Sequence, residues 1–422
     1  MHQALYNLAT RMLAPVLGLW LRFDRKHRVL RERFAPALPS LGASPIWVHA
    51  CSVGEVNTAI PLLEELQKRF PDAPIVLSSS TVSGHTLARD RLDTPVVWCP
   101  FDHPRSVARF LETLRPRLLV LVETELWPNL LGACAARKVP VVVANGRLSD
   151  RHFPRCRRLA RLLPGPFRSL AAVSAQCDLY AERYAALGIA ADRIRVTGST
   201  KFDSVVDSVN PAERSRLRRE CGIPQEAPLL VFGSTRPGEE ALAASCWRVL
   251  RDEIPGLRLV VAPRHVARVR EVRSCFDEPV QRRSELGGTA PPEGARVLLV
   301  DTVGELTAFY SLATVAVVGG SFYPGVGGHN PLEPCALGVP TVFGPYMASF
   351  LEPVEILLAA SGAIQVSEPG VLRNVLTRLL RNPVEGRQLG TRGRKAVLSH
   401  RGAIARNVDL IEATLVGASP SM

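Results

Sequence analysis

The chain has 422 residues, more than an ordinary single domain holds, and this length predicts two domains of about 200 residues each. Apolar residues make up 46% of the chain, charged residues 22% and aromatic residues only 6%. This composition excludes disordered and fibrous proteins and favours an α/β protein with aliphatic parallel strands. The formal net charge of +13 predicts an anionic partner, and an acidic membrane surface, a phosphorylated substrate and nucleic acid all qualify.

The N-terminal residues 1–33 are predicted to form a membrane anchor. Residues 12–21 form an apolar run that is short for a simple span of about 20 residues, but apolar residues recur at helical spacing through residues 5–19. Residues 22–33 follow and are rich in arginine. A basic segment beside an apolar helix suits an anionic cytoplasmic leaflet. A signal peptide would carry its positive charge before the apolar run. The alternative is a helix that packs its apolar stripe on the body of the protein.

From Ser44 onward, short aliphatic runs alternate with helical segments. Strands are predicted at residues 46–50, 75–79, 96–99, 118–123, 139–145, 170–174 and 194–197, with amphipathic helices such as 56–69 and 104–114 between them. Strands this apolar are typical of a parallel sheet that helices cover on both faces. The first domain is therefore predicted at residues 44–205.

The alternating pattern restarts after a polar stretch at residues 203–225. Further strands are predicted at residues 229–233, 257–262, 297–301, 315–319 and 341–344, followed by helical segments rich in arginine. They define a second domain at residues 226–400, with a C-terminal helix and tail at residues 401–422. The predicted fold is two doubly wound, Rossmann-like α/β domains facing a cleft, which bind ligands at the carboxyl ends of their strands.

Glu55 lies where the first strand turns directly into a helix, in the string Cys-Ser-Val-Gly-Glu. The positive end of the helix dipole suits an anionic substrate at such a turn. Glu55 is either a carboxylate that complements this dipole or a general base that takes a proton from an acceptor hydroxyl. In both cases we expect the dipole to favour its ionised form.

Two carboxylates, Glu123 and Glu125, follow the fourth strand in the string Glu-Thr-Glu-Leu-Trp-Pro-Asn. Packing does not explain such a pair after an aliphatic strand, so we expect one to face the cleft and the other to cap or pair. Arg147 follows the fifth strand and suits a carboxylate or phosphate. Beyond it, an arginine-rich segment without acidic residues predicts contact with an anionic lipid or phosphate surface, with a solvated helix face as the alternative; its candidate residues are Arg155, Arg157, Arg158 and Arg161.

A second set of polar positions follows the strands of the second half. The candidates are Ser234, Arg236, Arg264, His265, Gly304, Glu305, Leu306, Ser321, Asn330 and Glu333. Glycines at residues 319–328 would let the backbone approach a phosphate closely, and Glu333 could accept bonds from ribose hydroxyls. No G-x-G-x-x-G fingerprint or P-loop lysine motif follows the first strand of either half, which weighs against a dehydrogenase or an NTPase. Nine cysteines without C-x-x-C spacing predict a reducing compartment and no structural zinc.

The strings SVGE, ETELWPN, NGRLS, KFD, PRH, DTVGEL, GGS and GGHNPLEP occur in this order. With them the chain resembles the Kdo transferases, which attach 3-deoxy-D-manno-octulosonic acid to the lipid A precursor of Gram-negative bacteria, from its N-terminus to about residue 365. The resemblance implies a GT-B fold, a CMP-Kdo donor, lipid IVA as acceptor, and inverting transfer without an essential metal or other cofactor. It also implies lipopolysaccharide biosynthesis at the cytoplasmic face of the inner membrane.

The same resemblance implies roles for individual residues. Glu55 would be the catalytic base, and Glu123 or Glu125 would shape the catalytic cleft. The residues around CMP would be Arg264, His265, Gly304, Glu305, Leu306, Ser321, Asn330 and Glu333. The chain departs from the family at residues 79–85, where a Thr-Pro-Thr-Gly type of loop is usual, and at Arg236, where His is usual.

Two other classes of function fit parts of the sequence. A UDP-sugar transferase or epimerase can have the same fold, and only the strings ETELWPN and GGHNPLEP argue against it. A basic, non-catalytic protein that binds membranes or nucleic acid would need no carboxylates at strand ends and would show aromatic platforms. We therefore expect CMP-Kdo, a lipid A precursor and an anionic membrane surface as partners, and no nucleic acid.

Overall fold

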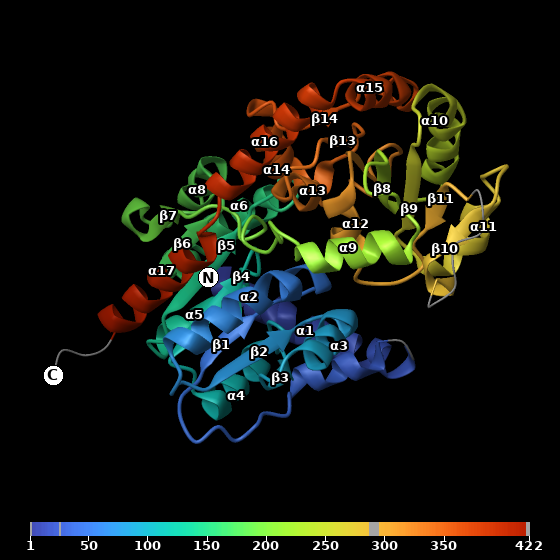
Figure 1. The fold of residues 1–422 in the computed structure, drawn as a ribbon. Coiled ribbons are helices and arrows are strands. Elements are labelled where there is room, and N and C mark those ends of the chain that lie inside the picture. Colours follow the sequence, from blue (N-terminus) through green and yellow to red (C-terminus); the bar gives the residue numbers. More distant parts are fainter. Residues whose placement is uncertain (1, 25–26, 287–294, 419–422) are drawn as a thin grey trace. The chain divides into compact units, whose positions relative to one another are not determined.

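The computed structural model describes residues 2–24, 27–286 and 295–418. The chain divides into two compact units, the first formed by Met1–Ser204 together with Arg401–Met422 and the second by Val205–His400. Each unit contains a seven-stranded sheet in which all neighbouring strands are parallel (Figure 1). All nine cysteines are free thiols.

The sheet of the first unit has the order β3-β2-β1-β4-β5-β6-β7. Its strands are β1 Ile46–His49, β2 Ile75–Ser79, β3 Val96–Trp98, β4 Leu118–Val122, β5 Val141–Gly146, β6 Ala172–Ala175 and β7 Ile194–Val196. The seven predicted strands are present with slightly shifted ends. The chain order reverses between β1 and β4, and a doubly wound sheet opens a crevice at the carboxyl ends of the strands on either side of such a reversal. The segments that follow β1 and β4 therefore meet there.

Helices connect these strands as the aliphatic pattern predicts. They are α2 Val53–Arg69, α3 Val82–Arg91, α4 Pro104–Leu114, α5 Pro128–Ala136, α6 Phe153–Leu162, α7 Pro164–Arg168 and α8 Asp178–Ala185, with the short η2 Ala191–Arg193 before β7. Serine and threonine side chains cap two of them: Ser52 accepts a bond from the backbone N–H of Glu55 at the start of α2, and Thr81 does the same for Gly84 in α3. Capping satisfies backbone donors that have no partner in the first helical turn.

The C-terminal helix α17 (Ala403–Ala418) packs on α2, β5 and β6 of the first unit. Val408 and Ile411 are fully buried in its core. Asn407 is also buried, and its Oδ1 accepts a bond of 2.8 Å from the backbone N–H of Asn145. Asp203 accepts bonds from the backbone N–H groups of Gly402 and Ile404 at the start of the helix. Residues 401–418 thus complete the first unit, whereas the sequence predicted only a separate helix and tail.

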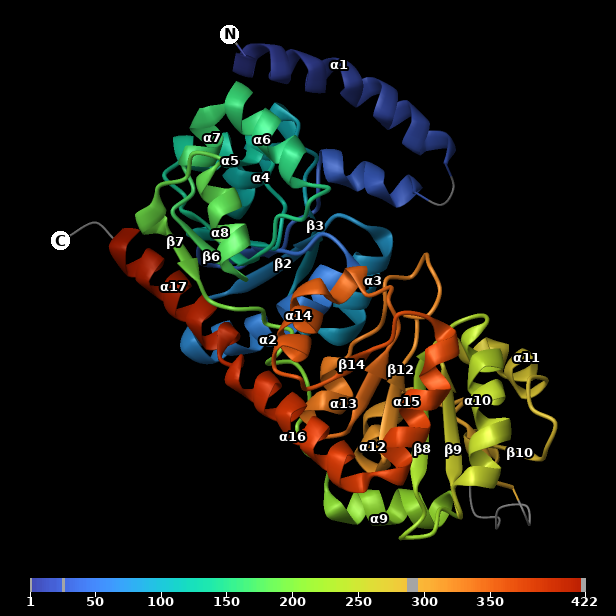
Figure 2. The ribbon, with the colours of Figure 1, turned by 90° about the horizontal axis from the view of Figure 1, so that it is seen from above.

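The N-terminal helix α1 (His2–Phe23) lies along the outside of the first unit, next to η1 (Arg28–Phe34) and α4 (Figure 2). Leu21 is its one fully buried side chain among the described residues. The Tyr6 hydroxyl donates to Asp102 over 2.8 Å, and Gln3 donates to Asn129 over 3.0 Å. Most other apolar side chains of α1 are exposed: Leu5, Leu8, Met12, Leu13, Val16, Leu19, Trp20 and Phe23. Within the described residues, no helix combines the length and the hydropathy that a membrane span requires.

The sheet of the second unit has the order β10-β11-β9-β8-β12-β13-β14. Its strands are β8 Leu229–Thr235, β9 Arg258–Pro263, β10 Val280–Arg282, β11 Val297–Leu299, β12 Val315–Val318, β13 Thr341–Phe343 and β14 Ile364–Gln365. The predictions missed β10 and β14, which are two edge strands of two or three residues. They also missed α9 (Pro211–Glu220), which lies in the stretch that we read as a polar connection.

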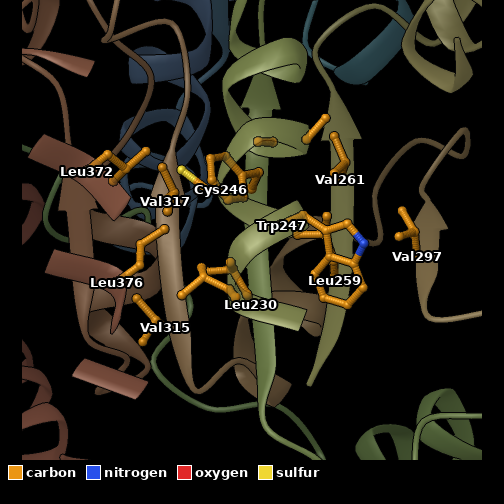
Figure 3. Packing of buried hydrophobic residues seen from close by; sticks show 14 of the residues in the cluster. Leu230, Cys246, Trp247, Leu259, Val261, Val297, Val315, Val317, Leu372 and Leu376 are labelled. Carbon is orange, nitrogen blue, oxygen red and sulfur yellow. The ribbon is translucent and has the colours of Figure 1, made fainter. Parts of the chain in front are cut away.

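Helices cover this second sheet as well: α10 Glu239–Glu253, α11 Val269–Arg273, α12 Leu306–Leu312, α13 Leu332–Ala336, α14 Leu351–Ala359, α15 Pro369–Arg381 and α16 Pro383–Ser399. Short η3 (Val266–Arg268), η4 (Arg283–Glu285) and η5 (Ala348–Phe350) lie between them. Figure 3 shows the core on one face of the sheet, where Trp247 of α10 and Leu376 of α15 are buried among strand residues such as Leu230, Leu259 and Val317. This packing fixes the strands whose carboxyl ends carry the predicted donor residues.

Candidate functional site

A cavity of about 490 Å³ lies at the carboxyl ends of β1 and β4 in the first unit. It brings together three carboxylates and two arginines, namely Glu55, Glu123, Glu125, Arg147 and Arg155. These residues come from four different strand ends or helices, so their meeting confirms the expectation that strand ends converge there. Three other predicted arginines do not line the cavity; Arg157, Arg158 and Arg161 are exposed on α6.

Glu55 lies in the first turn of α2 and folds back over the end of β1. Its carboxylate accepts a bond from the backbone N–H of Cys51. Burial, followed by the nearby charges of Glu125 and Glu123, raises the pKa of Glu55 to about 7 against the lowering effects of the Cys51 bond and of His49. The helix dipole is expected to favour the ionised form of Glu55, but burial and the neighbouring carboxylates outweigh it and favour the protonated form. A carboxyl group with this pKa can accept a proton near neutral pH and is a stronger base than an ordinary glutamate.

The pKa of Glu125 is shifted in the opposite direction. Its Oε2 accepts a bond of 2.8 Å from the indole N–H of Trp127 and lies 3.6 Å from Nε2 of His49. Burial alone would raise the pKa of Glu125, but His49, Trp127 and the charge of Arg33 outweigh it and lower the pKa. The two carboxylates of this cavity therefore have pKa values that are shifted in opposite directions. Such an arrangement allows one carboxylate, Glu55, to accept a proton while the other, Glu125, stays ionised.

His49 is the first residue of this site that the sequence analysis missed. It is the last residue of β1 and is fully buried, with Nδ1 3.1 Å from the carbonyl oxygen of Ser78 in the neighbouring strand. Burial opposes its charge, but Cys99 and Glu125 raise the pKa of His49. The imidazolium therefore forms an ion pair with Glu125 beneath the cavity.

Arg33 is the second residue that was missed, because the sequence placed it in the membrane-anchor segment. It lies in η1, and its guanidinium donates to the carbonyl oxygens of Cys99 over 2.8 Å and Ser80 over 3.3 Å. The same group stacks 4.2 Å above the ring of Phe101. Its charge contributes to the lowered pKa of Glu125. Arg33 thus contacts the body of the first unit, although it lies in the segment that the sequence analysis assigns to the anchor.

Glu123 adopts a left-handed backbone conformation with φ of 63°. Its carbonyl oxygen accepts a bond of 2.8 Å from the Tyr184 hydroxyl, and its N–H donates to Ala144 over 3.0 Å. A non-glycine residue in this conformation is strained, and surrounding bonds must hold it in place. The strained turn directs the chain from β4 into the cavity, where both Glu123 and Glu125 lie.

The fold also brings possible metal ligands together, although the sequence predicted no metal site. Cys51, Glu55 and Glu125 each offer a ligand atom, and these atoms lie within 4.8 Å of one another. Burial raises the pKa of the Cys51 thiol to about 12, so it is protonated at neutral pH and unsuited as a ligand. Both carboxylates are already held by protein donors. We assign no ion to this group.

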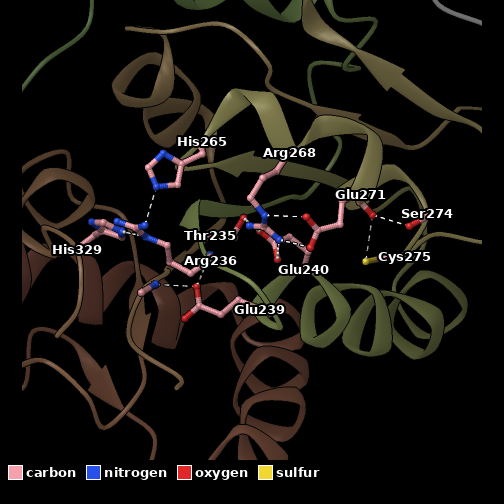
Figure 4. Close-up of polar contacts among 11 residues, drawn as sticks. Thr235, Arg236, Glu239, Glu240, His265, Arg268, Glu271, Ser274, Cys275 and His329 are labelled. Atoms are coloured by element: carbon pink, nitrogen blue, oxygen red, sulfur yellow. Dashed lines mark hydrogen bonds and ion pairs between the residues drawn. The ribbon is translucent and has the colours of Figure 1, made fainter. Parts of the chain in front are cut away.

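In the second unit, a cluster of basic side chains surrounds the carboxyl ends of β8 and β9 (Figure 4). The Arg236 guanidinium lies 2.7 Å from Nε2 of His265 and donates to Nε2 of His329 over 3.2 Å. Burial, then the charges of Arg236, Arg264 and His265, lowers the pKa of His329 to about 4. His329 is therefore neutral and orients Arg236, while two guanidinium groups remain as a concentrated positive charge suited to a phosphate.

Glu333 and Asn330 lie beside this basic cluster. The Asn330 amide donates to Glu333 over 3.3 Å, and its oxygen accepts a bond of 3.1 Å from the N–H of Leu332, the first residue of α13. Burial raises the pKa of Glu333, although Asn330 and the charge of Arg264 oppose this effect. The structure thus brings together Arg236, Arg264, His265, Asn330 and Glu333 of the predicted donor residues.

The glycine-rich turn after β12 differs from the expectation. Glu239 is buried and accepts bonds of 2.7–3.0 Å from the backbone N–H groups of Arg236, Gly320, Ser321 and Phe322. These N–H groups are consequently not open to a phosphate. A Cβ on Gly319 would lie 2.8 Å from Glu239 Oε2 and 2.7 Å from the Ser234 carbonyl oxygen, so this glycine permits close packing within the protein. Glu239 was not among the predicted residues.

The remaining predicted donor residues take mainly structural positions. The Ser321 hydroxyl is fully buried, donates to the Val318 carbonyl and accepts from the N–H of Gly344. Glu305 pairs with Arg283 over 2.8 Å and with Thr302. Gly304 has a φ of 95° in the turn before α12, and Leu306 begins that helix. Ser234, with a φ of 57°, lies at the bulge near the end of β8.

Comparison with known proteins links these sites to one family. Residues 28–204 match the sequence model of the N-terminal domain of 3-deoxy-D-manno-octulosonic-acid transferases, a range that includes Arg33, His49 and the three glutamates. The chain is 32% identical over 371 residues to the 3-deoxy-D-manno-octulosonic acid transferase of Haemophilus influenzae, covering 87% of this chain and 86% of the relative. It is also 32% identical over 433 residues to the 3-deoxy-D-manno-octulosonic acid transferase of Bordetella pertussis, covering 98% of this chain and 99% of the relative.

Among solved structures, MurG of Acinetobacter baumannii matches 88% of this chain and 100% of its own with a TM-score of 0.57. At 14% identity this likeness concerns the fold alone. Together with the two parallel sheets it confirms the predicted GT-B class. The chain therefore belongs to the family of 3-deoxy-D-manno-octulosonic acid (Kdo) transferases and is a glycosyltransferase with the GT-B fold.

Proposed function

We propose that this enzyme transfers Kdo from CMP-Kdo to a lipid A precursor, lipid IVA, with inversion at the anomeric carbon during lipopolysaccharide biosynthesis. One observation carries the proposal: Glu55, with a pKa raised to about 7, shares a cavity with the ionised Glu125 and with two arginines. This arrangement supplies a base for an acceptor hydroxyl and positive charge for an anionic acceptor. Membership of the family supports the identity of the transferred sugar.

The reaction is a single displacement in which Glu55 takes the proton of the acceptor hydroxyl. The acceptor oxygen forms a bond to the anomeric carbon as the bond from that carbon to the CMP phosphate oxygen breaks, and CMP leaves with the bonding electrons. The ionised Glu125 makes Glu55 more basic, because two adjacent carboxylates are unfavourable when both are charged. His49 and Arg33 keep Glu125 ionised throughout.

The donor binds to the second unit in this proposal. Arg236, Arg264 and His265 would hold the CMP phosphate, and their positive charge would stabilise the negative charge that develops on the leaving group. Glu333 would accept hydrogen bonds from the ribose and the base, and the Asn330 amide would donate a hydrogen bond to them. Ser234, at the bulge of β8, and Gly304, in the turn before α12, have left-handed backbones, and the chain could approach a ligand there.

The acceptor binds to the first unit in this proposal, at the cytoplasmic face of the inner membrane. Arg147 and Arg155 would contact the phosphates of the acceptor within the cavity. The exposed Arg157, Arg158 and Arg161 would face the anionic lipid surface. The exposed apolar side chains of α1 would enter the bilayer interface. A UDP-sugar transferase or epimerase and a non-catalytic membrane-binding protein are less consistent with the relatives and with the paired glutamates.

Replacing the base tests this function. Glu55→Gln preserves size and polarity but removes the proton acceptor, so single-turnover transfer from CMP-Kdo to lipid IVA should fall by roughly 10²–10⁴-fold. CMP binding should remain unchanged, because the proposed nucleotide residues lie on the second unit. Glu64→Gln, on the exposed face of the same helix, serves as the matched control and should keep wild-type turnover. Turnover of Glu55→Gln within roughly tenfold of wild type would remove Glu55 from this role.

A further inference from the structure

A second cavity of the first unit lies away from the three glutamates, between α1, η1 and the start of α4. Its volume is about 510 Å³. The residues that matter for its chemistry are Arg11, Ala14 and Gly18 of α1, Phe34 of η1, and His103 and Arg105 at the start of α4. None of them lines the cavity that contains Glu55.

Three basic side chains converge on this second cavity. Burial, then the charges of Arg105 and Arg11, lowers the pKa of His103, so both guanidinium groups lie close to this imidazole. The Nδ1 atom of His103 is buried and has no hydrogen-bond partner among the described residues. Within the same described part of the chain, no carboxylate forms an ion pair with Arg11 or Arg105. Two guanidinium groups without a counter-charge, beside an imidazole with an unused ring nitrogen, call for an anionic ligand.

The nearest acidic residue in the sequence, Asp102, is engaged elsewhere. Its carboxylate accepts bonds from the Tyr6 hydroxyl over 2.8 Å and from the backbone N–H of Leu130 over 2.8 Å. A third bond of 3.1 Å comes from the N–H of Asn129. These bonds fasten α1 and the start of α5 to one carboxylate. Asp102 therefore does not neutralise the basic side chains of the cavity.

The geometry of α1 indicates where an anionic ligand would come from. Arg11, Ala14 and Gly18 recur at helical spacing and form the face that lines the cavity. At about 100° per residue, Met12 and Val16 point away from this face, and they are 68% and 65% exposed. If the exposed apolar face enters a bilayer, the cavity lies on the opposite side of the helix, at the depth of lipid head groups rather than acyl chains.

We propose that the cavity between α1 and α4 binds the phosphate of an anionic phospholipid of the bilayer on which α1 lies. The two guanidinium groups would contact the phosphate oxygens and His103 would donate an N–H, while Ala14 and Phe34 provide an apolar wall for the glycerol carbons. This inference rests on the membrane association in the proposed function, but not on Kdo transfer. It means that α1 recognises lipid charge in addition to burying apolar surface.

The test measures flotation of the full-length protein with phosphatidylcholine vesicles, with and without phosphatidylglycerol. Wild type should bind both kinds and prefer the anionic one. Arg11→Gln/Arg105→Gln should lose roughly tenfold or more of the binding to anionic vesicles, since each arginine near a charged surface contributes about fivefold. Binding to neutral vesicles should stay at the wild-type level. The matched control, Lys138→Gln/Arg195→Gln, removes two exposed charges outside the cavity and should behave as wild type.

Two further experiments distinguish the effect of the cavity from that of the apolar face of α1, and binding of the lipid from binding of free phosphate. Met12→Ser/Val16→Ser should weaken binding to both kinds of vesicle, because it reduces the apolar face of α1. Phosphatidylglycerol should shift the NMR signal of His103 in the wild type, while inorganic phosphate should leave it unchanged. Equal losses in the cavity variant and in its control would overturn the proposal. A His103 shift with inorganic phosphate alone, or wild type binding neither vesicle, would overturn it as well.

Discussion

At the scale of single residues, Glu55 and Glu125 come from different strand ends, yet the charge of one acts on the protonation of the other. Glu125 is tied to His49 and Trp127, which lower its pKa, while burial and then the charge of Glu125 raise the pKa of Glu55. An isolated glutamate in the first turn of a helix would be the weaker base. The raised pKa of Glu55 therefore depends on its neighbours as well as on its own position in the helix.

The raised pKa of Glu55 has a consequence for stability that needs no substrate. The folded chain holds this proton up to a pKa of about 7, whereas the unfolded chain releases it near the ordinary value of 4.5. The contribution of Glu55 to the free energy of unfolding therefore falls as the pH rises through this window, and Gln at position 55 makes no such pH-dependent contribution. The melting temperature of Glu55→Gln should match wild type near the lower limit of the window and exceed it increasingly towards the upper limit. Thermal unfolding of both proteins across this pH window measures the difference between their melting temperatures. A difference that does not change with pH would contradict the raised pKa.

The donor cluster makes a second prediction at this scale. Arg264→Ala and Glu333→Ala should each weaken CMP binding by about 1–3 kcal/mol, the cost of losing a hydrogen bond to a charged group. Isothermal titration calorimetry measures this directly. Arg248→Ala is the matched control, because this arginine forms an exposed ion pair with Asp277 on the outside of the same unit. Wild-type affinity in both cluster variants would place the nucleotide elsewhere.

Sequence reasoning identified the three glutamates that meet in the cavity but not the residues that shift their pKa values. Glu55, Glu123 and Glu125 follow aliphatic strands, and a charge in that position is visible in the sequence. His49 ends a buried strand, and its importance depends on Glu125, which lies far along the chain. Ser321 and Glu305 illustrate the converse. Their positions at strand ends resemble those of ligand-binding residues, but one is fully buried and the other is paired with Arg283.

At the scale of helices and strands, the N-terminal segment has two parts with different roles. Helix α1 exposes its apolar residues, while η1 places Arg33 against the carbonyl oxygens of Cys99 and Ser80. A buried arginine that donates to carbonyl oxygens is costly to remove, since its acceptors lose their partner. Through Arg33, η1 therefore ties the N-terminal segment to the body of the first unit.

Two truncations distinguish these parts. Deletion of residues 2–23 should release the enzyme from membranes while the first unit stays folded. Deletion of residues 1–33 should in addition lower the melting temperature, because it removes Arg33. Sedimentation of membrane fractions and thermal unfolding measure the two effects separately, and Arg33→Lys in the full-length chain shows how much of the second effect is due to the guanidinium. Equal melting temperatures for both truncations would contradict the role of η1, and retention of both in the membrane fraction at high salt would contradict the role of α1.

Most elements followed from periodicity, and those that did not have a common physical reason. Strands β10 and β14 contain two or three residues, too few for a hydrophobic pattern to stand out. Helix α9 is strongly polar with one buried residue, Leu217, so its sequence resembles a connection. Helix α17 has a clear helical pattern, but its packing partners α2, β5 and β6 are far away in the sequence. Local patterns predict an element, whereas its partner depends on tertiary contacts.

At the scale of the whole molecule, the basic residues behind the net charge of +13 lie in several separate places. Arg147 and Arg155 line the catalytic cavity, Arg236 and Arg264 belong to the donor cluster, and three exposed arginines lie on α6. The overall charge predicted an anionic partner without specifying one. The structure divides the arginines among these separate places, and the proposed function assigns them to an acceptor phosphate, a nucleotide and a lipid surface.

The central claim is that this chain adds Kdo from CMP-Kdo to a lipid A precursor, and mass spectrometry of the product tests it most directly. The purified full-length enzyme is incubated with lipid IVA and, in separate reactions, with CMP-Kdo or with UDP-sugars. The account predicts that the lipid gains the mass of one or more Kdo residues with CMP-Kdo, that CMP is released in equal amount, and that UDP-sugars give no product. A lipid left unmodified by CMP-Kdo but extended by a UDP-sugar would contradict it.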